Sequence, residues 1–141
     1  MEKGTFTLGI IKPHAVAKGY IHEITKRIRM SGFAILGSKY VHLSLGEAEE
    51  FYAIHRGQEF FERLTKSMSS GALVALIIEK QDAVRSFRTL IGATNPAEAA
   101  EGTLRKQFGE STVLNALHGS DSDRNARREV NYFFTEINAA K

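Results

Sequence analysis

The stretch N-A-L-H-G-S-D-S, residues 115–122, places a carboxamide, an imidazole, two hydroxyls and a carboxylate directly before an amphipathic helical pattern. Gly119 and Ser120 are turn formers, which predicts that the preceding segment stops there and the chain changes direction. A helix beginning near Ser122 would place free backbone N–H groups and the positive end of a helix dipole close to His118. Such a terminus suits a phosphate, and a histidine beside it can attack phosphorus. A histidine near a turn is nevertheless more often a surface or capping residue, so the rest of the chain has to decide between the two interpretations.

The composition is that of an ordinary soluble protein. The chain has 141 residues, 43% of them hydrophobic and 25% charged, which suits a single domain over residues 1–141 with a core of its own. It has no cysteine, which excludes disulfides and thiolate metal sites. The longest apolar run, residues 72–78, falls far short of the ~20 residues of a membrane helix, and the apolar segment after Thr5 is too short for a secretion signal. We therefore expect a cytoplasmic protein without a membrane partner.

The protein is mildly basic, with a net charge of +3 and a pI of about 9.3. The basic residues are scattered and form no basic tract. This pattern is weak evidence for nucleic acid, which is not expected as the main partner, and fair evidence for small anionic ligands.

Hydrophobic patterning predicts strands over residues 5–12, 33–43 and 72–79, the last of them central because its apolar run is continuous. Pro13 ends the first strand, so Lys12 stands at the end of a core-facing row, although a lysine at a strand end often only reaches into solvent. Gly37 is a possible bulge in the second strand.

Helical spacing and caps predict a helix after each of the first and third strands and two helices between the second and third. Ser44 and Glu47 form a capping box that opens a helix through Ile54, and Asp82 can cap the helix that follows the third strand. A last helix carries the apolar stripe Ala126, Val130, Phe133, Phe134 and Ile137. The element order predicts an α+β fold of the ferredoxin-like β-α-β-β-α-β plan, an antiparallel sheet covered by helices. A long loop, residues 92–114 with a short helical turn at Thr103, precedes the strand that carries His118.

No glycine-rich phosphate-binding motif occurs, so a nucleotide would have to be held by side chains. Lys12, Arg88 and Arg105 can supply the charges, and Thr94 a hydroxyl. A covalent intermediate on His118 would split phosphoryl transfer into two half-reactions at one site, and a Ser120–Glu129 pair could orient the ring. The residues alone leave open which imidazole nitrogen reacts.

The motif resembles the active-site signature of nucleoside diphosphate kinases, and the likeness covers essentially the whole chain. Five further segments resemble that family in order and spacing: Ile10-Ile11-Lys12-Pro13, Phe60-Phe61, Leu90 to Pro96, Gly102-Thr103-Leu104-Arg105, and Glu129. The chain departs from common family residues at Ala72, Lys80 and Thr112, and the last of these could tune base preference.

The resemblance implies a ping-pong transfer of the terminal phosphate from a nucleoside triphosphate to a nucleoside diphosphate, with Mg²⁺ and broad base specificity. His118 resembles the phosphorylated nucleophile, and Ser120, Glu129, Lys12 and Tyr52 would complete the catalytic set. The nucleotide contacts implied are Lys12, Phe60, Arg88, Thr94, Arg105 and Asn115, with Asn115 at the ribose and Phe60 stacked on the base. Asp121 would hold the metal through water. Members of the family are tetramers or hexamers, so the resemblance implies a homo-oligomer.

Two other classes of function remain open. A ferredoxin-like module could bind nucleotides or single-stranded nucleic acid without turnover, with Phe60 as an exposed aromatic. Both Phe60 and Tyr52 could equally be ordinary core residues, and Glu129 a solvated glutamate. Mere binding does not require a nucleophile beside Lys12, Arg105 and Glu129, which favours the enzyme. An assembly or regulatory role could coexist with catalysis.

Overall fold

Four antiparallel strands form the centre of the computed structural model, which describes residue 2 and residues 4–134. The strands are β1 (Phe6–Ile11), β2 (Ala34–Val41), β3 (Leu73–Glu79) and β4 (Leu117–Gly119), in the spatial order β2-β3-β1-β4. β1 pairs antiparallel with both β3 and β4, and β2 pairs antiparallel with β3. This topology confirms the predicted ferredoxin-like sheet and places β4, with His118, directly beside β1.

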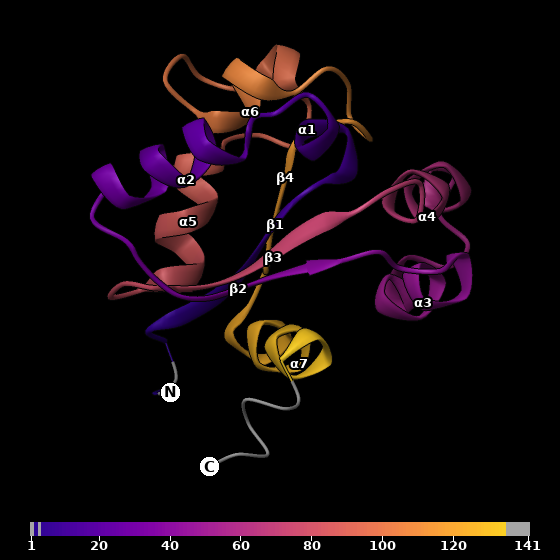
Figure 1. Cartoon of the computed structure of the whole chain (residues 1–141), viewed down its shortest axis with the longest axis horizontal. Coiled ribbons are helices and arrows are strands. Elements are labelled where there is room, and N and C mark those ends of the chain that lie inside the picture. Colours follow the sequence, from indigo (N-terminus) through magenta and orange to yellow (C-terminus); the bar gives the residue numbers. More distant parts are fainter. Residues whose placement is uncertain (1, 3, 135–141) are drawn as a thin grey trace.

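Helices cover both faces of the sheet (Figure 1). α2 (Ile21–Met30) and α5 (Ala83–Ile91) lie on one face, and α7 (Asp123–Phe133) lies on the other. α3 (Leu45–Phe51) and α4 (Phe61–Met68) pack together beside one end of the sheet. The short elements are α1 (Pro13–Ala17), η1 (Ala53–His55), η2 (Pro96–Glu98) and α6 (Leu104–Phe108).

The burial of the strands follows from this layering. All six residues of β1 are buried, because its two faces meet α7 on one side and α5 on the other. β2 instead alternates between exposed and partly exposed residues, as expected for an edge strand. The pairing register shifts between Ile35 and Gly37, which confirms the predicted bulge.

Close packing explains the glycine of the His118 motif better than flexibility does. Gly9 and Gly119 pair across β1 and β4, and a Cβ at either position would come within 3.0–3.2 Å of the Phe87 ring on α5. These two glycines therefore let α5 approach the sheet directly beside His118.

Side-chain caps open α3, α6 and α7 among the described α-helices. The predicted capping box is present: Ser44 Oγ accepts from Glu47 N at 3.1 Å, and Glu47 Oε1 accepts from Ser44 N at 2.9 Å. The helix ends at Phe51, however, and not at Ile54, because the chain tightens into the 3₁₀ turn η1. The prediction for Asp82 is wrong: it lies at φ 54°, makes no side-chain cap, and its carboxylate pairs with Arg85 Nε at 3.2 Å.

The segment that leads into β4 is ordered by short helices. η2 and α6 lie within the predicted loop, and Thr103 Oγ1 accepts from Lys106 N at 3.3 Å, which confirms the helical turn expected there. Pro13 ends β1 as predicted and also opens α1, a helix that the sequence pattern did not predict. Ile137 of the last apolar stripe lies outside the described residues. Among residue 2 and residues 4–134, no helix combines the length and hydropathy needed to cross a bilayer.

Candidate active site

A cavity of about 380 Å³ opens where the ends of β1 and β4 meet α3, α5, α7 and the loop before β4. Ten of the eleven residues predicted for the site line it: Lys12, Tyr52, Phe60, Arg88, Thr94, Arg105, Asn115, His118, Asp121 and Glu129. The eleventh, Ser120, is fully buried and reaches the site through Glu129. Residues spread over the whole sequence thus converge on one concave surface.

His118 is held by a carboxylate, which is itself held by a hydroxyl. Its Nε2 lies 2.7 Å from Glu129 Oε1, and Ser120 Oγ donates to the same oxygen at 2.9 Å. Because an ionised carboxylate only accepts, Nε2 carries the proton and Nδ1 is left with a lone pair. Glu129 is 4% exposed and sits on α7 two turns after the cap at Ser122, whose Oγ accepts from Asn125 N. The interpretation of Glu129 as a solvated glutamate is therefore wrong.

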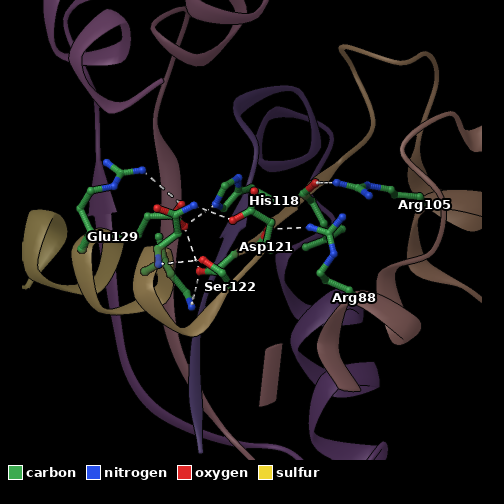
Figure 2. A network of polar contacts seen from close by, with 12 residues as sticks. Arg88, Arg105, His118, Asp121, Ser122 and Glu129 are labelled. Atoms are coloured by element: carbon green, nitrogen blue, oxygen red, sulfur yellow. Dashed lines mark hydrogen bonds and ion pairs between the residues drawn. The ribbon is translucent and has the colours of Figure 1, made fainter. Parts of the chain in front are cut away.

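Within the described part of the chain, four cationic side chains line the cavity: Lys12, Arg88, Arg105 and Arg128. Figure 2 shows Arg88 and Arg105 on the side of His118 opposite Glu129. Arg105 is 7% exposed and donates to Gly92 O and Leu117 O, both at 2.9 Å. It therefore fastens the preceding loop to β4 as well as presenting charge. Arg88 NH1 donates to Gly119 O at 3.4 Å.

Lys12 is 4% exposed, so it does not extend into bulk solvent, and its Nζ donates to Val113 O at 3.3 Å. Burial, and next the positive charge of Arg105, lowers the pKa of Lys12 to about 7. Burial, and next the charge of Arg88, lowers the pKa of Arg105 to about 10. Arg105 thus lies close enough to both Lys12 and Arg88 for their positive charges to repel, and a partly enclosed space lined by these cations suits a polyanion.

Three of the described residues that line the cavity have a buried polar atom without a protein partner: Asn115, Tyr52 and Arg105, the last through its Nε. Asn115 Nδ2 donates to Thr94 O and Thr112 O, but its Oδ1 makes no hydrogen bond. The hydroxyl of Tyr52 is likewise buried and unpaired. Buried polar atoms are almost always paired, so these atoms are available to a polar ligand.

Aromatic rings line the side of the cavity formed by α3 and α4. Phe60 is partly exposed at the start of α4, with His55 behind it at 5.4 Å between ring centroids. Tyr52 is 5% exposed and meets the His118 ring edge to face at 5.9 Å. Phe60 thus lines the cavity with a partly exposed ring, whereas Tyr52 is a core residue that also lines the cavity.

Two acidic side chains, Asp121 and Glu129, are among the described residues that line the cavity. Asp121 Oδ1 accepts from Asn125 Nδ2 at 2.6 Å, and this bond, followed by the charge of Arg88, holds the pKa of Asp121 below its usual range. Among the described residues, no three His, Cys, Asp or Glu side chains gather as a metal site. The expected phosphate site at the start of α7 is not part of this cavity. Ser122 and Asp123 line a neighbouring depression, whose charged side chains are of both signs: Asp82, Arg85, Arg88, Asp121 and Asp123.

Arg128 and Phe51 are among the cavity residues that the sequence analysis missed. Arg128 lies 3.5 Å from Glu129 Oε2 and stacks over Phe51, whose ring in turn meets the His118 ring at 5.6 Å. Neither has a local motif. The only available signal is position, because each directly precedes a predicted site residue, Glu129 or Tyr52.

Comparisons with known proteins agree with this geometry. A family model described as nucleoside diphosphate kinase matches residues 5–139. A protein named nucleoside diphosphate kinase from Chlamydia caviae is 52% identical, and the match covers 96% of this chain and 98% of that protein. A protein of the same name from Salinibacter ruber is 48% identical, and the match covers 92% of each chain. The crystal structure of the Aquifex aeolicus nucleoside diphosphate kinase superposes with a TM-score of 0.90 at 39% identity, covering 92% of this chain and 94% of that one. The crystal structure of the Encephalitozoon cuniculi nucleoside diphosphate kinase superposes with a TM-score of 0.89 at 35% identity, covering 92% of this chain and 88% of that one. The chain therefore belongs to the nucleoside diphosphate kinase family, enzymes that transfer phosphate between nucleotides.

Proposed function

We propose that His118 accepts the terminal phosphate of a nucleoside triphosphate on Nδ1 and passes it to a nucleoside diphosphate. The observation that carries this proposal is the 2.7 Å contact between His118 Nε2 and Glu129 Oε1. It engages one nitrogen and leaves the lone pair of the other free to attack. In the first half-reaction the bond between Nδ1 and phosphorus forms as the bond to the diphosphate oxygen breaks. In the second half-reaction an acceptor diphosphate oxygen attacks phosphorus, and the electron pair returns to Nδ1.

Glu129 and Ser120 act on the ring and not on the phosphate. As phosphorylation makes the imidazole cationic, the nearby carboxylate stabilises the developing charge, and Ser120 Oγ fixes that carboxylate. Lys12, Arg88 and Arg105 neutralise the phosphate oxygens, with Thr94 adding a hydroxyl at the mouth of the cavity.

The rest of the nucleotide would occupy the other side of the cavity. The unpaired Oδ1 of Asn115 is the acceptor for a ribose hydroxyl, and the unpaired Tyr52 hydroxyl belongs to another residue that lines the same cavity. Phe60 would stack on the base, and stacking without edge hydrogen bonds predicts that purines and pyrimidines are both accepted.

The family needs a divalent cation, and we propose Mg²⁺ at Asp121. A single carboxylate fits, because Mg²⁺ is commonly held by one or two carboxylates with water and substrate phosphates completing its shell. When bound, the ion would offset negative charge on the phosphates.

The test is transfer of label from γ-labelled ATP without an acceptor. We expect an acid-labile, alkali-stable phosphoprotein whose label moves to added GDP or CDP, with the phosphorus NMR signal of Nδ1-phosphohistidine. His118→Ala should lose the label, while the exposed His22→Ala should keep it. A labelled His118→Ala protein, or a signal from the Nε2 isomer, would contradict the proposal. Nucleotide binding by the wild type without any labelling would instead favour the pure binding module.

We also propose that the protein forms a homo-oligomer and functions in the cytoplasm. β2 is an edge strand within the described sheet, and it exposes the large apolar side chains of Leu36 (50%) and Tyr40 (67%). An exposed edge with apolar side chains is a surface on which strands of another chain add. Sedimentation velocity would distinguish tetramer from hexamer, and cell fractionation would test the location.

A further inference from the structure

The residue two positions before His118 adopts a strained backbone. Ala116 has φ 72°, and Leu117 N donates to Asn115 O at 2.9 Å across it, which makes a γ-turn of the rare positive-φ form. An alanine in this region costs free energy and persists only when its surroundings hold it there. The turn sets the direction of both Asn115 and His118, so the groups that hold it help to set the geometry of the site.

Two backbone groups of Ala116 are held by the corner between β1 and α1. Lys12 N donates to Ala116 O at 2.8 Å, which is an ordinary backbone contact. The amide of Ala116, however, donates to a side chain, His14 Nε2, at 2.9 Å. His14 comes from α1, the helix that no sequence signal predicted, and its side chain is only 12% exposed.

These contacts select one form of the His14 ring. Nε2 must be unprotonated because it accepts from an N–H group. His14 Nδ1 lies 3.2 Å from Glu110 Oε2, and a carboxylate accepts, so Nδ1 carries the proton. Glu110 is in turn held by Lys18 Nζ at 2.7 Å. The neutral Nδ1–H tautomer satisfies every partner, whereas a protonated ring would point a second N–H at the Ala116 amide.

We propose that His14 is a positioning residue for catalysis, which in its neutral form holds the Ala116 turn and thereby aims His118 and Asn115. The proposal rests on the role of His118 given above. It makes the site sensitive to acid through a group that does not touch the substrate. Protonation of His14 would convert the acceptor of the Ala116 amide into a donor and release the turn.

The electrostatic surroundings favour the neutral ring. Burial is the largest cause that lowers the pKa of His14 from its ordinary value, and the charges of Lys12 and Lys18 add to it, while Glu110 opposes them. β3, which packs against α1, is apolar from Leu73 to Ile78. The ionisable residues of α4, the other helix packed against α1, are exposed: Glu62, Arg63 and Lys66. The contact with Ala116 is therefore present at neutral pH and is lost only as the pH falls below the ordinary histidine range.

Three variants test the proposal. His14→Gln can place a non-titrating amide oxygen near the position of Nε2, His14→Ala removes the acceptor, and the exposed His22→Gln is the matched control. The Ala116 amide signal, in protein labelled with ¹⁵N-alanine, is followed from pH 5 to 8 together with the single-turnover rate of His118 phosphorylation. We expect a step in the Ala116 shift for the wild type and His22→Gln that is absent from His14→Gln.

The kinetic expectation follows from one lost hydrogen bond. His14→Ala should slow phosphorylation about three- to tenfold at pH 7.5 with little change in KM, and His14→Gln should restore most of the rate. The rate of His14→Gln should also fall less between pH 7.5 and 5.5 than that of the wild type. An unchanged Ala116 titration in His14→Gln, or an unchanged rate in folded His14→Ala, would overturn the proposal. Failure of the His118 assignment would appear separately, as label retained by His118→Ala.

Discussion

Replacing Glu129 by glutamine tests how much the charge behind His118 contributes to phosphoryl transfer. Three donors point at this carboxylate: His118 Nε2 at 2.7 Å, Ser120 Oγ at 2.9 Å and Arg128 NH2 at 3.5 Å. A glutamine of the same shape can keep its oxygen towards His118 and Ser120. Its amide nitrogen then faces Arg128, whose partly exposed side chain can move away. Glu129→Gln thus keeps the geometry and removes the charge.

The expected loss follows from the strength of the bond. A hydrogen bond to a charged group is worth about 1.5–3 kcal/mol and a neutral one about 0.5–1.5 kcal/mol. The variant therefore forfeits about 1–2 kcal/mol of stabilisation as the imidazole becomes cationic, which is roughly a 5- to 30-fold slower phosphorylation step. Folding stability should change little, because a buried carboxylate is costly to desolvate and its loss offsets the weaker bond.

Single-turnover labelling with γ-labelled ATP gives the rate, and urea denaturation at matched protein concentration gives the stability. Glu23→Gln on α2, an exposed glutamate outside the cavity, is the control and should leave both values unchanged. A phosphorylation rate for Glu129→Gln within twofold of the wild type would refute the proposed role of the charge. A loss of stability as large as the loss of activity would show that Glu129 is mainly structural.

Three further predictions follow from the buried contacts. Ser120→Ala should destabilise the fold by about 1–3 kcal/mol in urea titrations, because it leaves the Leu8 N–H, which now donates to Ser120 Oγ at 3.2 Å, buried without a partner. Nucleotide binding at pH 8 should be accompanied by proton uptake, because the pKa of Lys12 is about 7 and bound phosphate would raise this pKa. Calorimetry in buffers of different ionisation enthalpy measures the uptake, and Lys12→Met should abolish it. Phe60→Ala should weaken binding of adenine and cytosine diphosphates to a similar extent, by about 1–3 kcal/mol in titration calorimetry, and a loss confined to one base would contradict simple stacking.

Strong local signals made most of the fold predictable. The period-two and continuous apolar runs identify β1 and β3, and the capping box at Ser44 identifies the start of α3, because each feature depends only on neighbouring residues. The family resemblance then assembled distant site residues that no local pattern could bring together. Lys12 and Glu129 are 117 positions apart in the sequence, yet both line the same cavity.

The features that the sequence did not predict depend on tertiary contacts. Asp82 looks like a cap, but it lies in a left-handed conformation, and the first amide of α5, Ala83 N, donates to the distant Gly4 O at 3.0 Å. Nothing about an alanine suggests φ 72° at Ala116, since this backbone is imposed by the corner of β1 and α1. The acceptor role of His14 likewise becomes visible only when α1 is placed beside the strand that carries His118.

The free site carries electrostatic and hydrogen-bonding costs that a nucleotide would relieve. Lys12 and Arg105 repel each other while buried, and the Asn115 Oδ1 and Tyr52 hydroxyl atoms lack partners. A phosphate chain would offset the repulsion, and a ribose would supply hydrogen bonds to the unpaired atoms. The elements that bear these groups are held independently of any ligand, by the β1–β4 pairing and by the bonds from Arg105 to Gly92 and Leu117. Because these elements are already in place, nucleotide binding does not have to order the site. The free energy of binding can instead position the phosphate beside His118.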